Sequence, residues 1–242
     1  MKVSKEKKKE IRNDLLQAAV EVFTEKGFRA ATMREISTRA GYGVATIYNY
    51  FPNKDKILYA YFDIKLTETV ETVKNIPDLD EFTLKEKLQI LLETVLDIYL
   101  QDREFVAETY QMLFDSPLKT YSEFQAIHDV ITDTVKSFLT TAAEKGEIPE
   151  VPFEKLIAAL YDEYCILIVL FWLRDDSEGF ANTSQLIDLS LDLIVGILKS
   201  GLITKSFEII IFLFKNFVYG SIGNLHTLFS SLKNFQEKHL KD

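Results

Sequence analysis

The sequence KGFRAATMREISTRAGYGVATIYNYFPNKDKIL, residues 26–58, decides the fold of this 242-residue chain. Thr32 followed three residues later by Glu35 is the signature of a capping box, which starts a short helix. Gly41 and Gly43 bracket a turn, and a second short helix follows them. Two short helices on either side of a glycine turn form a helix-turn-helix, and this motif indicates DNA binding.

The helical pattern continues on both sides of this motif. Apolar residues at helical spacing between residues 11 and 23 predict a preceding helix. We expect the last helix of the motif over residues 44–50 and a further helix, capped by Asn53, from 54 to about 74. Residues 1–52 are therefore predicted to form a three-helix DNA-binding head with a basic amino-terminal arm.

Residues 53–242 consist of amphipathic segments separated by prolines, and alternating strand-like patterns are absent. We therefore predict an all-α chain in which a long helix joins the head to a larger helical bundle. Residues 204–242 are expected to form a carboxy-terminal extension. The expected helices lie at about residues 82–100, 103–115, 118–145, 153–175, 182–200, 205–218 and 222–239.

The two parts of the chain differ in charge. Residues 1–56 hold 12 Lys and Arg against 7 Asp and Glu, a net charge of +5. The remaining residues hold 16 against 30, a net charge of −14. Because DNA phosphates repel the acidic remainder, the nucleic-acid face is expected at the amino end.

Composition limits the compartment and the class of protein. Cys165 is the single cysteine, and the longest charge-free apolar run, residues 164–173, is half the length of a membrane span. We expect a cytoplasmic protein without a membrane partner. One cysteine and three scattered histidines offer no metal-ligand spacing, and a glycine-rich phosphate loop is absent. We expect no catalytic residue, no metal, no cofactor and no enzymatic activity; a helical lipid-handling enzyme is the alternative.

One series of residues in the head is specific: Gly27, Phe28, Thr32, Ile36, Ala40, Gly41, the run Thr46-Ile47-Tyr48-Asn49-Tyr50-Phe51, and Lys54. This series resembles the amino-terminal domain of the tetracycline-repressor (TetR) family of transcriptional regulators over about residues 8–58. The resemblance implies a homodimer that binds a palindromic operator and releases it when a small molecule enters the larger domain. It makes residues 53–242 a ligand-binding and dimerisation domain.

The helix over residues 44–50 has one face for the core and one for DNA. Helix geometry turns Ile47 inward and leaves the opposite face free for the major groove. Members of the family often carry Ser, then Lys or another polar residue, then Gly at the positions of Gly43, Val44 and Ala45. The apolar side chains of Val44 and Ala45 cannot hydrogen-bond a base edge but can touch thymine methyls. Arg34 matches a position that faces DNA in the tetracycline repressor and is the best candidate for a guanine contact; a solvated cation is the alternative.

Phosphate contacts would fix the register of the head on DNA without reading sequence. The hydroxyls of Tyr48 and Tyr50 and the helix starts at Thr32 and Lys54 are suited to this role. The complete set of predicted DNA-binding residues is Thr32, Arg34, Gly43, Val44, Ala45, Thr46, Tyr48, Asn49, Tyr50 and Lys54.

Aromatic side chains of the larger domain either line a ligand cavity between helices or pack as core. His128 is a polar pocket group or a structural histidine, and Asp162 is a carboxylate that a cationic ligand or a salt bridge would neutralise. The predicted ligand-binding residues are Tyr99, Tyr110, Phe114, Phe124, His128, Tyr161, Tyr164 and Phe171.

Two late helices, over residues 153–175 and 182–200, carry more apolar surface than one small core needs, and the family resemblance makes them the dimer helices. Core packing is the alternative for them. The predicted dimer residues are Leu160, Ile168, Trp172, Leu186, Leu189, Leu193 and Ile197.

The sequence as a whole predicts a ligand-responsive DNA-binding regulator, namely a repressor released from its operator by an apolar or amphipathic small molecule. The alternatives are a helical lipid-binding protein that never engages DNA and a DNA-binding regulator without a ligand. The apolar stretch 207–218 would cover the dimer seam, cap the bundle or touch a membrane surface.

Overall fold

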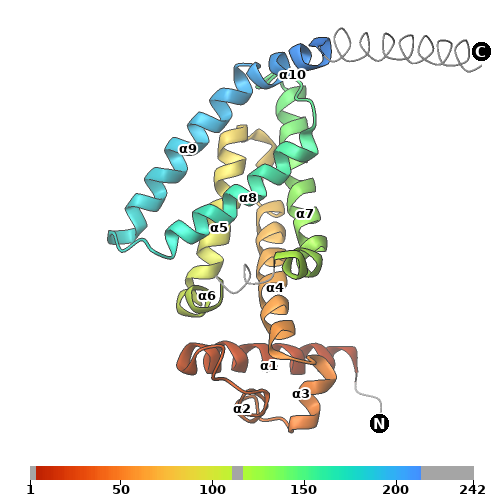
Figure 1. Ribbon diagram of the computed structural model, residues 1–242, viewed down its shortest axis with the longest axis vertical. Coiled ribbons are helices and arrows are strands. Elements are labelled where there is room, and N and C mark those ends of the chain that lie inside the picture. The colour runs from red at the N-terminus through yellow and green to blue at the C-terminus, as the bar shows by residue number, and fades with distance from the viewer. Residues whose placement is uncertain (1–3, 111–116, 214–242) are drawn as a thin grey trace, which may run out of the picture.

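The computed structural model describes residues 4–110 and 117–213, and within these ranges the chain is helical without strands, as predicted (Figure 1). The helix expected at residues 222–239 and the candidate residue Phe114 lie outside the described ranges. The helices are α1 (Lys5–Lys26), α2 (Met33–Arg39), α3 (Val44–Tyr50), α4 (Lys54–Lys74), α5 (Leu84–Leu100), α6 (Arg103–Thr109), α7 (Pro117–Glu144), α8 (Glu154–Trp172), α9 (Ala181–Lys199) and α10 (Leu202–Leu213), with short 3-10 turns η1 (Leu79–Glu81) and η3 (Glu178–Phe180).

Helices α1, α2 and α3 form a head around one small core at one end of the molecule (Figure 1). Phe23, Ile36 and Ile47 are fully buried there, which confirms the inward face predicted for α3. The side chain of Asn53 accepts a hydrogen bond from the backbone N–H of Lys56 and caps α4 at the predicted residue. Local signals in the sequence therefore place the starts of α2 and α4, whereas α1 begins at Lys5, before the apolar residues that predicted it.

Two polar contacts fix α2 and the following turn on α1. The guanidinium of Arg39 lies 2.7 Å from a carboxylate oxygen of Glu25 and also contacts Glu21. The hydroxyl of Tyr42 donates to Asp14 at 2.6 Å, and this bond raises the pKa of Tyr42 to about 12. Both contacts limit the rotation of the helix-turn-helix on α1.

The head joins the rest of the chain, here called the body, through two helices. Helix α4 rises from the head into the body, and α6 packs against α1 (Figure 1). Phe105 of α6 stacks on Phe23 of α1 with ring centroids 6.0 Å apart, and it meets Tyr61 of α4 edge-on at 4.5 Å. The long helix predicted from the sequence is therefore not the sole connection between the two parts.

The body is a bundle in which α7 packs on α8 and α4, while α9 packs on α5 and α8. One of its segments, Glu178–Lys199, is long and apolar enough by composition to cross a membrane. In the fold, however, α9 carries Asp188 and Asp192, which both pair with Lys85 of α5 at 2.7 and 2.6 Å. Its buried residues face the bundle, so α9 is positioned as a bundle helix.

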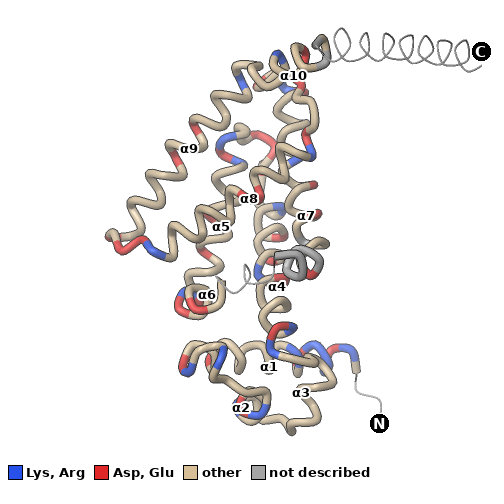
Figure 2. The backbone as a smooth tube through the Cα atoms, viewed as in Figure 1, with Lys and Arg blue, Asp and Glu red and all other residues tan. Residues whose placement is uncertain are grey.

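Charge divides the molecule along its length. Figure 2 shows both kinds of charge in both parts, but the net charge is +5 for residues 1–56 and −14 for the remainder. The basic end is the one that carries α2 and α3. An electrostatic attraction to phosphates would therefore orient the head toward DNA and the body away from it.

Candidate nucleic-acid interface and effector core

Helix α3 has one face exposed to solvent and one face buried in the head. Tyr48 is 53% exposed, and Val44, Ala45 and Asn49 are exposed on the same side of the helix. Ile47 is the anchor beneath them, so this face is held at a fixed orientation by the core of the head. The open surface is about two turns long, which suits the edge of a major groove.

The remaining residues of α3 and its start occupy intermediate positions. Gly43 is the N-cap residue, and its carbonyl accepts the N–H of Thr46 at 2.8 Å. Thr46 and Tyr50 are half-buried between the exposed face of α3 and the core of the head. Their placement at the rim is compatible with the predicted contacts to DNA.

Helix α2 begins with the predicted capping box. The N–H and the hydroxyl of Thr32 both donate to Glu35, each at 2.9 Å, and the N–H of Glu35 donates back to Thr32. Lys26 reaches the same carboxyl group at 2.5 Å and, with Thr32, lowers the pKa of Glu35 to about 2. Both donors of Thr32 are used within the chain in a capping role, and its contact to phosphate stays a prediction. Arg34 is exposed beside this cap.

Lys54 has a structural role within the head, and its phosphate contact stays a prediction. Its ammonium donates to the carbonyls of Phe28, Arg29 and Ala31 at 2.6, 3.1 and 2.7 Å. It also lies 4.9 Å from the centroid of the Phe28 ring, and burial lowers its pKa. An ammonium has three donors, and all three are occupied here. Lys54 therefore closes the loop between α1 and α2, a role that sequence spacing could not reveal.

The predicted ligand-binding aromatics of the body come together around a residue that sequence analysis missed. Phe62 of α4 is fully buried and lies 5.8 Å from Tyr99, 5.7 Å from Tyr110 and 6.4 Å from Phe124 between ring centroids. Tyr161 is also buried in the body. The spacing of Phe62 from Leu58 on the inner face of α4 was the available signal. We call the cluster of Phe62, Tyr99, Tyr110 and Phe124, with His128 and Asp162, the effector core. The Tyr161 ring lies 5.6 Å from Tyr164 instead, and its hydroxyl donates to the carbonyl of Leu88.

A polar pair lies at the edge of the effector core. Nδ1 of His128 on α7 is hydrogen-bonded to the carboxylate of Asp162 on α8. This bond raises the pKa of His128, while desolvation opposes the rise. The Phe124 ring meets the His128 ring edge-on at 6.3 Å. The carboxylate that the sequence offered to a cationic ligand is therefore paired within the chain.

Phe171 and Tyr164 do not join the effector core. Phe171 is 42% exposed on the outer face of α8, so its predicted role as a lining residue is wrong. Tyr164 is half-buried and shares a hydrogen bond of 2.6 Å with Ser190 of α9. These two residues belong to the contact region of α8 and α9 instead.

Helices α8 and α9 leave apolar stripes in solvent. Leu160, Leu189, Leu193 and Ile197 are exposed, with Leu193 at 65%, and Leu186 is half-buried. The stripe on α8 consists of Leu156, Leu160, Leu167 and Phe171, preceded by Phe153. We call these exposed side chains the open face.

Two residues predicted for the dimer belong to the interior of one chain. Ile168 and Trp172 are buried, the latter with only 2% of its surface exposed. The Arg103 guanidinium lies 5.2 Å from the centroid of the Trp172 ring and donates to the carbonyl of Trp172 at 3.1 Å. Because both faces of α8 are apolar, the sequence did not reveal which one packs inward. The open face therefore contains Leu167 and Phe171 in place of Ile168 and Trp172.

Two family models match this chain. Residues 15–62 match the model described as bacterial regulatory proteins of the tetR family, and residues 87–213 match the tetracyclin repressor-like carboxy-terminal domain. The fatty acid metabolism regulator protein of Bacillus subtilis (strain 168) is 30% identical over 137 residues, which cover 56% of this chain and 70% of the relative.

Several solved structures have the same fold as this chain. The transcriptional regulator FadR from Bacillus subtilis, in complex with stearoyl-CoA, is 25% identical with a TM-score of 0.59 and covers 78% of this chain and 97% of its own. The fatty acid degradation regulator FadR from Bacillus halodurans is 23% identical with a TM-score of 0.59, covering 79% and 97%. Both the head and the body thus have counterparts in known regulators.

Proposed function

The chain belongs to the TetR family of transcriptional regulators, and we propose that it is a homodimeric repressor that leaves its operator when an acyl compound enters the effector core. The single observation that carries the DNA-binding part is the open surface of α3 above buried Ile47. A base-reading surface must be exposed and held rigidly, and α3 meets both conditions. The homologous bacterial regulators support a cytoplasmic location, which is part of the proposal.

The effector class follows from the chemistry of the effector core. Its buried aromatic rings offer an apolar surface for an alkyl chain, and the His128–Asp162 pair offers one polar group at the edge. With Nδ1 directed to Asp162, Nε2 of a protonated His128 is free to donate to a thioester or carboxyl oxygen. The relative from Bacillus subtilis that binds stearoyl-CoA supports an acyl thioester as the ligand.

The proposed dimer forms through the open face. Exposed Leu160, Leu189 and Leu193 would be hidden when α8 and α9 pair with the same helices of a second copy. Two heads would then lie side by side and match a two-fold symmetric operator. The apolar surface of α9 is thereby used between protein chains rather than in a bilayer.

Signal transfer would run through both connections between body and head. Phe62 places α4 in the effector core, and the same helix starts at the head with Lys54. Phe105 on α6 packs on the head core. A ligand that separates the aromatic rings around Phe62 would shift α4 and α6 and so change the spacing of the two heads.

A salt-titrated binding assay with the DNA upstream of the chain's own coding sequence tests this function. We expect that DNA to bind more tightly than random DNA at equal salt, and we expect stearoyl-CoA to release it. Free coenzyme A is the matched control and should leave the complex intact. Equal affinity for upstream and random DNA would refute the operator, and indifference to acyl-CoA of every chain length would refute the effector.

A further inference from the structure

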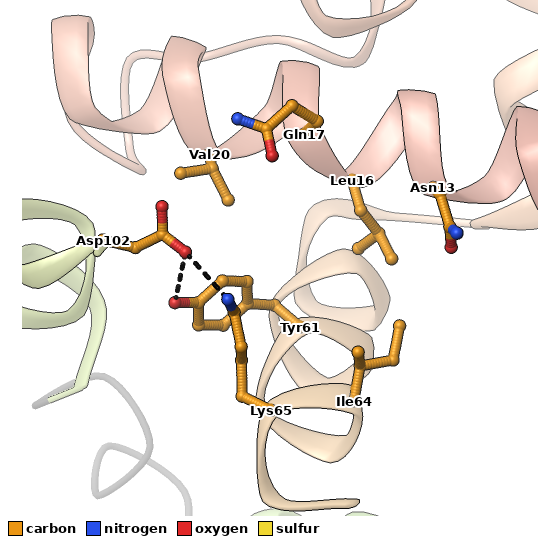
Figure 3. Close-up of a pocket in the computed structure, with 8 residues that line it drawn as sticks. All are labelled: Asn13, Leu16, Gln17, Val20, Tyr61, Ile64, Lys65 and Asp102. Atoms are coloured by element: carbon orange, nitrogen blue, oxygen red, sulfur yellow. Dashed lines mark hydrogen bonds and ion pairs between the residues drawn. The ribbon is translucent and has the colours of Figure 1, made fainter. Parts of the chain in front are cut away.

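A hollow of about 170 Å³ lies at the junction of head and body, apart from the effector core. Figure 3 shows Leu16, Gln17 and Val20 of α1 on one side, with residues of α4 facing them. Its lining combines apolar surface with two amides and one ion pair. The lining residues are Asn13, Leu16, Gln17, Val20, Tyr61, Ile64, Lys65 and Asp102.

The ion pair in this hollow is loosely made. The ammonium of Lys65 lies 3.4 Å from Oδ2 of Asp102, although only 16% and 20% of the two side chains are exposed. The same carboxylate oxygen accepts the Tyr61 hydroxyl at 3.0 Å, and the other oxygen points toward α1 (Figure 3). Within the part of the chain that the structure describes, the Lys65 ammonium donates no hydrogen bond. The ammonium has three donors, and its contacts are the long one to Asp102 and the Tyr61 ring 5.7 Å away, so a ligand that supplies acceptors at hydrogen-bonding distance gains affinity.

We propose that this hollow is a second ligand site, which takes a small zwitterion with an apolar side chain, the chemical class of the apolar α-amino acids. The ligand carboxylate supplies acceptors to Lys65, and the ligand ammonium meets the second oxygen of Asp102. Its apolar side chain lies on Leu16 and Ile64, and the amide of Gln17 lies within the rim. A ligand with both charges keeps the site neutral, whereas a ligand with one charge is repelled by one member of the pair.

The location gives this site a direct effect on the head. The lining comes from α1 of the head, from α4 and from Asp102 in the turn before α6, so one molecule touches both connections between head and body. A ligand in the hollow lies between α1 and α4, so it changes the orientation of α1 on α4. It does this without entering the effector core. The site is therefore a second input, and its ligand binding does not depend on the proposed operator or acyl ligand.

Calorimetry on the full chain with three ligands of one shape tests the proposal. Leucine carries both charges, 4-methylpentanoate lacks the ammonium, and 3-methylbutylamine lacks the carboxylate. We expect leucine to bind in the micromolar to millimolar range, and each analogue to bind at least about tenfold more weakly. Equal binding of leucine and either analogue would overturn the zwitterion, and failure of leucine, valine and phenylalanine alike to bind would overturn the site.

Variants separate this hollow from any other site. Lys65→Met and Asp102→Asn should each weaken leucine binding about tenfold or more, because each removes one charge of the pair. Lys74→Met, at the exposed far end of the same helix, is the matched control and should bind leucine as the natural chain does. Circular dichroism checks that the variants remain helical. Unchanged leucine binding in both hollow variants would refute the site, even if DNA and acyl-CoA bind as proposed.

Discussion

Helix α3 of the head and helix α8 of the body use apolar residues differently. Helix α3 buries Ile47 in the chain and turns Tyr48 to solvent, so a single inner face fixes its orientation. Helix α8 buries Trp172 on one face and exposes Leu160 and Leu167 on another. A single chain therefore buries only part of the apolar surface of α8. The core of the head is thus closed within one chain, whereas the body leaves apolar residues in solvent that the proposed second copy would cover.

This difference separates the effects of mutations. Substitutions in the head should change DNA contact or the stability of one chain. Substitutions on the open face should change assembly first, and DNA binding as a consequence of assembly.

The largest effect is expected from Leu193→Arg. A charge placed in the proposed dimer seam should yield helical monomers, and loss of the second head should lower operator affinity by about 100-fold or more. Sedimentation measures the assembly. Leu100→Arg, an equal change at an exposed leucine of α5, is the control and should remain dimeric. An unchanged dimer for Leu193→Arg would place the interface elsewhere.

The second largest effect is expected for Lys54→Met, and it tests the structural role of Lys54. Lys54→Met removes three charge-assisted hydrogen bonds to carbonyls and should lower the free energy of unfolding by roughly 2–3 kcal/mol. Urea denaturation measures this change, with the exposed Lys8→Met as control. The salt dependence of DNA binding should stay the same in Lys54→Met. A slope lower by about one ion at unchanged stability would restore Lys54 as a phosphate contact.

Arg34→Ala tests whether α2 reads a base. If Arg34 contacts guanine, the change should cost roughly 1–3 kcal/mol on the operator and relax the preference at one position in each half-site. Arg29→Ala removes the same charge from an exposed position of the head and should not alter sequence preference. Equal losses of Arg34→Ala on operator and random DNA would remove Arg34 from base recognition.

The smallest effect is expected in the body at His128. Its pKa is raised above the ordinary 6.5 by Asp162, so the pair stabilises the fold fully below that value and loses its contribution as pH rises through the raised pKa. His128→Gln should therefore cost more stability at about pH 6 than at about pH 9. Urea denaturation at both values measures the difference, and Asp162→Asn should show the same trend. A pH-independent cost in both variants would contradict the pair.

The head could be predicted almost completely because its signals are local. The capping box at Thr32 and the glycines around the turn act within a few residues, so the helix boundaries follow from neighbouring sequence. What sequence could not give is the reach of long side chains. Lys54 bonds to carbonyls more than twenty residues earlier in the chain, and that contact depends on the folded loop.

The helices of the body could be predicted from the sequence, but the face that each helix buries could not. Three of the named aromatics, Tyr99, Tyr110 and Phe124, meet in one cluster around Phe62, which belongs to a helix that the sequence presents as a connection. Helix α8 is apolar almost all round, and the choice between Phe171 and Trp172 as the inner residue depends on contacts with α6 and α9. Long-range packing, which no local sequence pattern encodes, determines which of the two residues is buried.

Release of the head from DNA by an acyl ligand in the body can be tested through the linkage between the two binding equilibria. Calorimetry should compare the affinity of stearoyl-CoA for the free dimer with its affinity for the operator-bound dimer. We predict tighter binding to the free dimer, by the same factor by which stearoyl-CoA weakens operator affinity. Equal affinities for both forms would contradict release by this ligand, since a ligand that does not distinguish two states cannot shift the balance between them.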